Sequence, residues 1–200
     1  MTNLVRRILF VCGFLGLAAC SILQPQPDLS RFFVLTPMTP PVAPISAKPL
    51  RLGLGPIEFP AYLQRAQMVT RIGVNEINLS ETHRWGEPLD ANFARVVAQN
   101  LAALLAPDQI LSFPWYGGAQ LNYAIQISVA QFEVDTGGEA RLRARWKITD
   151  PGSNKTLHTA QSDWQEQATD SSPDAAVAAL SRLVEKLSRE VANNLEALRQ

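Results

Sequence analysis

The chain has 200 residues and balances 18 lysines and arginines against 18 aspartates and glutamates. A balanced chain has no global electrostatic attraction for nucleic acid, and we expect no nucleic-acid partner. The length and the hydrophobic fraction of 46% suit one globular domain with a sizeable core.

The first twenty residues have the layout of a bacterial secretion signal. Arg6 and Arg7 precede a short apolar run, and small residues lead to Cys20 in the order Leu-Ala-Ala-Cys, which resembles the bacterial lipobox. The run from Ile8 to Ala19 is too short to cross a membrane as a helix, which needs about twenty residues. We therefore expect residues 1–19 to be a lipoprotein signal peptide and the sulfur of Cys20 to be lipidated.

Acyl chains on Cys20 would anchor the mature chain, because two or more chains hold a protein on a bilayer stably. Ser21 stands where an aspartate usually retains such proteins in the inner membrane, so we expect the periplasmic face of the outer membrane. An ordinary secretion signal with an incidental cysteine is the alternative. Cleavage would also remove Cys12 and two arginines, leaving 16 basic against 18 acidic residues and no thiol for a disulfide.

Residues 20–30 are predicted to form a tether, because they are polar and include Pro25 and Pro27. Residues 31–200 then form a single periplasmic domain, which opens with a predicted strand at Arg31–Leu35. Five prolines between residues 37 and 49 argue against a helix or a central strand there. We interpret this stretch as a stiff connector, and a ligand for an aromatic groove is the alternative.

Two strands and a helix follow the connector. Leu50–Ile57 and Met68–Leu79 are predicted strands, separated by a segment that Pro60 interrupts. A helix is predicted to begin near Pro88 and to end before Pro107. Its apolar residues fall on one stripe: Phe93, Val96, Val97, Leu101, Leu104 and Leu105.

A hairpin is the firmest local prediction. Apolar and polar residues alternate from Leu121 to Val129, and the phase then slips, which predicts a β-bulge near residues 130 and 131. Closing the turn at Thr136-Gly137-Gly138 places Phe132 opposite Leu142 and Glu133 opposite Arg141, so both faces match in chemistry. Residues 155–167 are predicted to form the next strand.

The last predicted element is a long helix that begins at Ser172 and Pro173, an N-cap followed by proline at the first helical position. Its apolar stripe favours packing across the sheet, with a coiled-coil seam as the alternative. The element order predicts an α+β fold. We expect a mixed, mostly antiparallel β-sheet of five or six strands with two main helices packed on one face.

Motifs that carry chemistry are scarce. His83 and His158 lie far apart without a metal-ligand spacing, and Gly53-Leu54-Gly55 lacks the remainder of a dinucleotide site. Glu76, Glu81 and Glu87 surround His83, but their spacing defines no catalytic geometry. We therefore expect no catalytic residues, no metal, no cofactor and no enzymatic activity.

Two sets of residues are candidates for binding. Arg141, Arg143, Arg145 and Lys147 line one strand face, which suits lipid head groups or an acidic partner. The favoured interpretation pairs these cations with Glu133, Asp135, Asp163 or Glu166 on neighbouring strands. Trp85 and Trp115 are expected in loops, where aromatic side chains can anchor a partner.

Two runs between residues 50 and 105 are specific enough to indicate a family. Residues 60–71 read Pro-x-Tyr-Leu-x-Arg-x-Gln-x-Val-x-Arg, and residues 85–89 read Trp-x-Glu-Pro-Leu. With the early strand Phe33-Val34-Leu35, they resemble the paraquat-inducible protein C family of ABC-type transport auxiliary lipoproteins. Past Gln109 the resemblance rests only on the order of strands and helices.

The resemblance implies a lipoprotein that serves an inner-membrane ABC-type complex and a periplasm-spanning protein with mammalian-cell-entry (MCE) domains. Such a protein would dock the MCE protein at the outer membrane and would support lipid movement and envelope integrity. One form of this hypothesis is a homo-oligomeric ring. The residues matching the family motifs either hold loops or touch the partner, and an ion pair of Arg65 or Arg71 with Glu87 would favour the first role. They are Pro60, Tyr62, Leu63, Arg65, Arg71, Trp85, Glu87 and Pro88.

Two other classes stay open on the sequence. One is a lipid-carrying or lipopolysaccharide-assembly lipoprotein that binds acyl chains directly. The other is a lipid-anchored envelope enzyme, which would require a polar pocket with a nucleophile.

Overall fold

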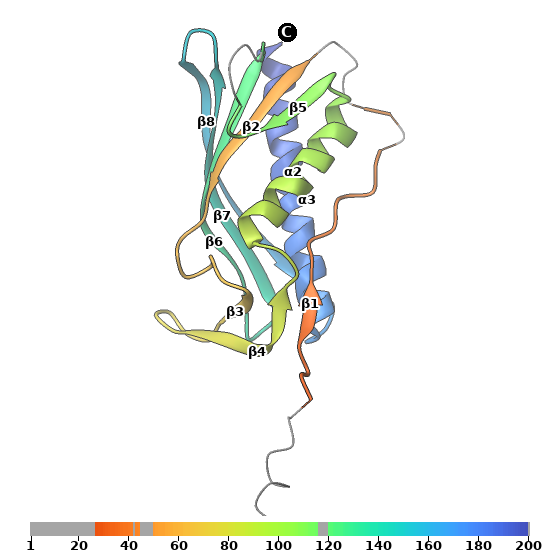
Figure 1. Cartoon of the computed structure of the whole chain (residues 1–200), viewed down its shortest axis with the longest axis vertical. Coiled ribbons are helices and arrows are strands. Elements are labelled where there is room, and N and C mark those ends of the chain that lie inside the picture. The colour runs from red at the N-terminus through yellow and green to blue at the C-terminus, as the bar shows by residue number, and fades with distance from the viewer. Residues whose placement is uncertain (1–26, 42, 45–49, 116–119, 200) are drawn as a thin grey trace, which may run out of the picture.

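The structure, a computed structural model, describes residues 27–41, 43–44, 50–115 and 120–199 (Figure 1). The predicted signal peptide, Cys20 and the first part of the predicted tether lie outside these residues. The described part of the chain forms one sheet with two long helices, which confirms the α+β class.

The sheet is mixed, and its long central strand joins two parts. Strands run in the order β1-β4-β3-β6-β2-β5, and β7 pairs with β6 and β8. Antiparallel pairing links β6, β7 and β8, whereas β6 pairs parallel with β2 and β3. The strands are β1 (Arg31–Phe33), β2 (Arg51–Glu58), β3 (Gln67–Arg71), β4 (Ile77–Trp85), β5 (Gln109–Ser112), β6 (Tyr123–Asp135), β7 (Glu139–Asp150) and β8 (Lys155–Gln167).

The sheet has eight strands in the described residues, more than the five or six predicted. The segment Met68–Leu79, predicted as one strand, is an antiparallel hairpin of β3 and β4. Its turn is closed by the amide of Ile72, which donates to the carbonyl of Glu76. Apolar residues also occur within this turn, so the sequence pattern does not reveal where the first strand ends. The remaining strand, β5, has only four residues, too few for a periodic pattern.

The predicted hairpin is confirmed as β6 and β7. Phe132 pairs with Leu142 and Glu133 with Arg141, as expected from the matching faces. The register shifts between Val129 and Gln131, at the predicted bulge. Local alternation therefore specified both the pairing and its irregularity.

Both helices cover the same face of the sheet (Figure 1). Helix α2 (Leu89–Leu105) ends at Ala106, whose left-handed φ of 43° turns the chain before Pro107. Helix α3 (Pro173–Leu198) begins after Ser172, whose side chain accepts a hydrogen bond from the amide of Ala175. Helix α3 packs across β6, β7 and β8, which confirms the predicted sheet packing, and it also contacts α2.

An aromatic cluster lies at the centre of the core between α2 and the sheet. Phe59, Phe93 and Phe132 meet edge to face, with ring centroids 5.3 to 6.2 Å apart. This cluster connects the segment after β2 to the first turns of α2 and to β6. It therefore fixes the position of the motif residues that follow Phe59.

The segment after β1 runs along the two helices and is held by buried amides. The amide of Leu35 donates to Asn92 Oδ1 at 3.2 Å, and that of Met38 donates to Asn100 Oδ1 at 2.8 Å. Both asparagines belong to α2 and are fully buried. These bonds place β1 beside β4, at the end of the molecule where the described chain begins (Figure 1).

Candidate functional site

Two of the motif residues are core residues. Leu63 and Trp85 are buried. Trp85, expected in a loop, is instead the last residue of β4, where it pairs with Phe33 and donates its amide to the carbonyl of Ala66 at 2.7 Å. The pairing with β1 extends β4 to the tryptophan, which the sequence around residue 85 does not reveal.

A buried carboxylate holds two further motif residues. Glu133 is 2% exposed and accepts hydrogen bonds from Tyr62 Oη at 2.8 Å, Arg71 Nε at 2.7 Å and Gln131 Nε2 at 3.0 Å. Burial, followed by the hydrogen bond to Glu133, raises the pKa of Tyr62 to about 12. The same carboxylate raises the pKa of Arg71 through its hydrogen bond. This buried acid joins the motif loop and β3 to β6.

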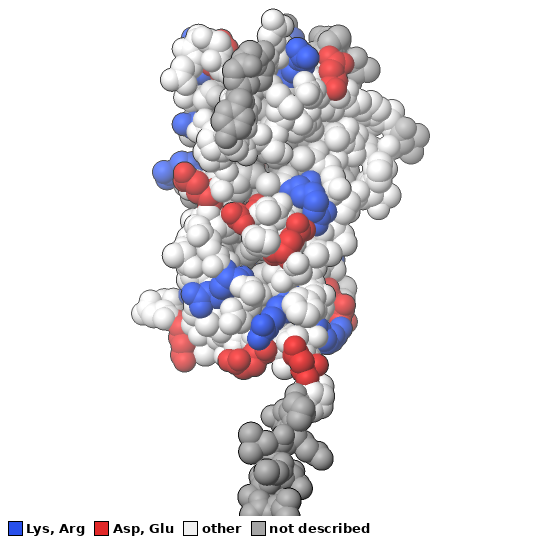
Figure 2. Space-filling model, viewed as in Figure 1, with Lys and Arg blue, Asp and Glu red and all other residues white. Residues whose placement is uncertain are grey.

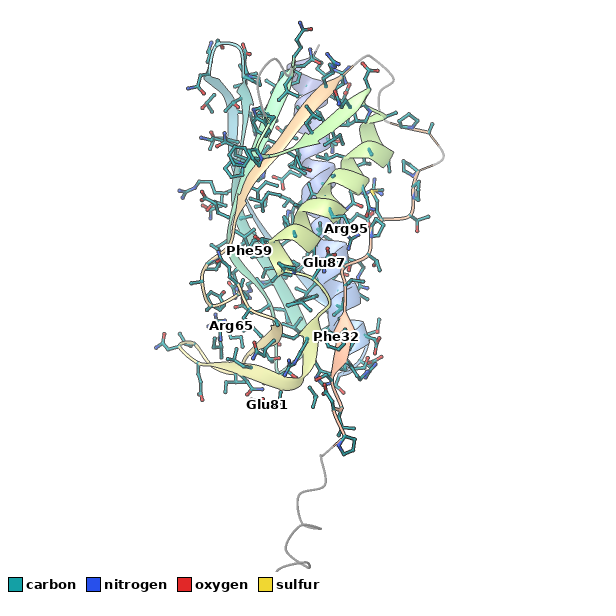
Figure 3. All side chains as sticks on the ribbon, viewed as in Figure 1. Phe32, Phe59, Arg65, Glu81, Glu87 and Arg95 are labelled. Carbon is teal, nitrogen blue, oxygen red and sulfur yellow. The ribbon has the colours of Figure 1, made fainter. Side chains whose placement is uncertain are left out.

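The predicted ion pair between Glu87 and Arg65 or Arg71 is wrong. Glu87 accepts from Arg95, at 2.6 Å from Nη2 and 3.1 Å from Nε. Arg95 lies two turns into α2, so its side chain reaches back to the residue that precedes the helix. Arg71 is occupied by Glu133. Figure 3 shows Glu87 and Arg95 lying together over α2.

Two arginines on this side of the molecule have a buried Nε atom without an acceptor among the described residues. Arg65 lies in the motif loop, and Arg84 lies in β4 opposite Gln67. In both side chains the Nε atom is buried without a hydrogen bond, and neither guanidinium forms an ion pair within the described residues. Hydrogen bonds from Ser30 lower the pKa of the Asp28 carboxyl, and the charge of Arg84 adds to this effect through space.

An exposed apolar pair lies beside Arg84 and Gly86. Phe32 pairs with Arg84 across β1 and β4 and is 65% exposed, and Val34 lies next to Gly86 on the same side. We call Phe32, Val34, Arg65 and Arg84 the motif face. Figure 2 shows basic residues across the lower half of this view and acidic residues along its lower edge. Of the two motif prolines, Pro88 is exposed and Pro60 is half-buried.

A cavity of about 530 Å³ lies behind β3 and β4. We call it the hairpin cavity. Its mouth is polar and includes Ser80, His83, the turn at residues 135–138 and the loop at residues 167–173. His83 Nδ1 lies 3.0 Å from Ser80 Oγ, and its ring meets Phe33 edge to face. The floor is apolar and comes from the motif loop, three strands and both helices: Leu63, Met68, Trp85, Leu89, Phe132 and Leu180.

The basic face of β7 is partly neutralised. Arg143 pairs with Asp163 at 3.0 Å, as predicted, whereas Arg141 pairs with Glu139. Glu166 does not pair with the cations of β7, because its carboxylate binds Arg182 and Lys186 of α3 at 2.9 and 2.6 Å. Arg145 and Lys147 form no ion pair with any other described residue, and they border a shallow pocket with Glu58 and Gln126.

Metal-ligating side chains do not gather anywhere in the described ranges. Neither described helix combines the length and apolarity that crossing a membrane requires. Among the described residues, the motif face and the hairpin cavity are therefore the two candidate binding sites.

Two solved structures share the fold. One, of an uncharacterised protein, has a TM-score of 0.69 and 15% identity, covering 83% of this chain and 98% of its own. The other, from Xanthomonas campestris, has a TM-score of 0.67 and 15% identity, covering 81% of this chain and 92% of its own. At these identities the likeness concerns the fold alone. No curated protein matches the sequence.

A family match covers most of the chain. Residues 33–192 match the family described as ABC-type transport auxiliary lipoprotein component. The matched range runs from β1 into the last turns of α3 and includes both motif runs and every strand after β1. The chain therefore belongs to the ABC-type transport auxiliary lipoprotein component family.

Proposed function

We propose that this protein is the outer-membrane auxiliary subunit of an ABC-type lipid transport system. In this role it docks the periplasm-spanning MCE-domain protein, and it thereby supports envelope integrity. The observation that carries the proposal is the motif face, where the exposed Phe32 pairs with Arg84 and where Arg65 and Arg84 each have an Nε atom without an acceptor. Family membership supplies the transport context.

The arginines of the motif face suit a protein partner. Both side chains are partly exposed and form no ion pair with another described residue, so a carboxylate of the partner can pair with them without displacing an acid of this chain. A guanidinium presents several donors in a fixed fork and binds carboxylates in two-pronged fashion. Phe32 adds an aromatic side chain of the kind that dominates binding hot spots.

Docking is tested by charge reversal on the motif face. We expect chemical crosslinking and pull-down of the native protein to recover an MCE-domain protein, and the double variant Arg65→Glu/Arg84→Glu to lose it. Arg51→Glu is the matched control, because Arg51 is an exposed arginine at the start of β2. Equal recovery with all three proteins, or no recovery with the wild type, would contradict the proposal.

Anchoring through lipidated Cys20 is the second part of the proposal. Cys20→Ala should release the protein from the outer membrane, because acyl chains supply the membrane affinity. Ser21→Asp should instead shift the protein to the inner membrane. Membrane fractionation with mass spectrometry of the mature amino terminus measures both, and an unmodified amino terminus on wild-type protein would refute lipidation.

We also propose that several copies assemble as a ring around the docked partner. Native mass spectrometry of the detergent-extracted protein measures the number of copies. A strictly monomeric protein, with and without the MCE partner, would exclude the ring.

A further inference from the structure

We infer that the hairpin cavity binds a single acyl chain of a membrane lipid, with the polar part of the lipid at the cavity mouth. The inference rests on the membrane anchoring proposed above and goes beyond docking. Three features of the described residues carry it. The cavity floor is apolar, and the carboxylates at the mouth already accept hydrogen bonds within the fold. The cavity also lies beside the start of the described chain.

The cavity has the size and lining of a site for an apolar ligand. Its volume of about 530 Å³ falls within the range of about 300–1,000 Å³ that is usual for small-molecule sites. The floor is formed by buried apolar side chains from β3, β4, β6 and both helices, and no lysine or arginine is among the described residues that line the cavity. Such a floor favours a hydrocarbon chain over a charged ligand.

The acids near the mouth are already satisfied within the fold. Glu133 is held by Arg71 and Tyr62. Asp135 accepts from the amides of Gly137 and Glu139, and Asp170 accepts from the amide of Ser172. These carboxylates therefore do not require a cationic ligand, and the hydroxyl of Ser80 and the ring of His83 add further polar groups at the mouth.

The cavity lies at the end of the molecule that the anchor holds near the bilayer. Arg31 begins β1, pairs with His83 at the mouth in the strand register, and binds Asp174 in the first turn of α3 at 2.8 Å. Ten residues lie between Cys20 and Arg31, so the two residues are at most roughly 40 Å apart when the segment is extended. The mouth is therefore within reach of the membrane surface.

Exposed apolar residues at the same end strengthen the assignment. Leu29 is 71% exposed, and Val74, at the tip of the β3–β4 hairpin, is 91% exposed. Ile72, in the same hairpin, is exposed as well. These three residues come from two separate segments that flank the cavity, and a membrane interface is the setting in which such side chains lose contact with water.

The test uses the full-length protein reconstituted into vesicles of phosphatidylethanolamine and phosphatidylglycerol. The probe is a phosphatidylethanolamine with a photoactivatable diazirine in one acyl chain. We expect crosslinks to fall on floor residues such as Leu63, Met68 and Leu180. Crosslinks confined to the exposed residues outside the cavity would overturn the inference.

Filling the cavity supplies the matched comparison. Ala176 lines the cavity on α3, whereas Ala178 lies on the exposed side of the same helix. Ala176→Phe should abolish labelling of the floor, and Ala178→Phe should leave it unchanged. Thr70→Phe narrows the cavity from β3 and serves as an independent variant if Ala176→Phe folds poorly. Full floor labelling in a folded filled variant would overturn the inference.

The source of the acyl chain is distinguished by Cys20→Ser, which cannot carry the anchor. This variant is added to the same vesicles. If floor labelling is higher than in the wild type, the cavity normally holds the protein's own anchor. If labelling is equal, the cavity holds an acyl chain of a bilayer phospholipid. No floor labelling in either form overturns the inference. Ala176→Phe should still recover the MCE-domain protein in pull-down, so failure of acyl binding and failure of docking are separate results.

Discussion

Glu133 shows at the level of one residue why the family motif matters to the fold. Its carboxylate is almost fully buried, and the side chains of Tyr62, Arg71 and Gln131 donate to it. A buried carboxylate is tolerated only when it is paired and hydrogen-bonded. The motif residues Tyr62 and Arg71 meet this requirement, so their part in the motif is structural.

Removal of this carboxylate should therefore be costly. We expect Glu133→Ala to lower the free energy of unfolding by about 3 kcal/mol, because it leaves Arg71 and Tyr62 without their acceptor. Urea unfolding followed by circular dichroism measures the change. The control is Glu185→Ala, which removes an exposed helical ion pair with Arg189 and should cost about 0.3–0.5 kcal/mol. A similar loss in both variants would count against a structural role for Glu133.

Tyr62 gives a prediction at alkaline pH. Its pKa in the folded protein is about 12, raised chiefly by burial, whereas an unfolded tyrosine titrates near 10. Because the folded pKa is the higher one, this contribution to stability is complete below pH 10 and declines as the pH rises towards 12. Tyr62→Phe should remove this decline, as measured by unfolding at several alkaline pH values. An unchanged pH profile would refute the assignment.

Among the elements, the segment after β1 depends on two buried asparagines rather than on a strand partner. Asn100 accepts from the amide of Met38 and donates to the hydroxyl of Ser188 on α3. It therefore joins this segment to both helices. Nothing in the proline-rich sequence around residue 38 predicts such an attachment.

Asn100→Ala should release this attachment. We expect a loss of about 1–3 kcal/mol in stability, since the amide of Met38 stays buried without an acceptor. Hydrogen exchange at Met38 should accelerate more than exchange in β6. Asn78→Ala, at an exposed position of β4, is the control and should leave the exchange at Met38 unchanged.

The spacing of apolar residues predicts the long helices and strands correctly and several of the short strands incorrectly. The β6–β7 hairpin and α3 were predicted because alternation or helical spacing persists over many residues. The sequence predicts one strand in place of the β3–β4 hairpin, because Ile72 and Val74 are apolar although they are exposed at its turn. Strand β5 forms only because β2 offers it an edge.

For the molecule as a whole, one core joins the helices to the sheet. Helix α3 packs on β6, β7, β8 and α2, and the aromatic cluster ties α2 to β6. We therefore expect a single cooperative unfolding transition. Near-ultraviolet signals from the tryptophans, which include the buried Trp146, should follow the same urea curve as far-ultraviolet signals from the helices. Separate curves would indicate two independent units.

The α+β class, the long helices and the main hairpin with its bulge can be predicted from the amino-acid sequence, because spacing along the chain reports which face of an element is apolar. The motif runs indicate the family. The ion pairs of Arg71 with Glu133 and of Glu87 with Arg95, and the cavity behind β3 and β4, become visible in the folded chain alone. A periodic pattern shows that a face is buried, whereas the residue that covers it comes from a distant part of the chain.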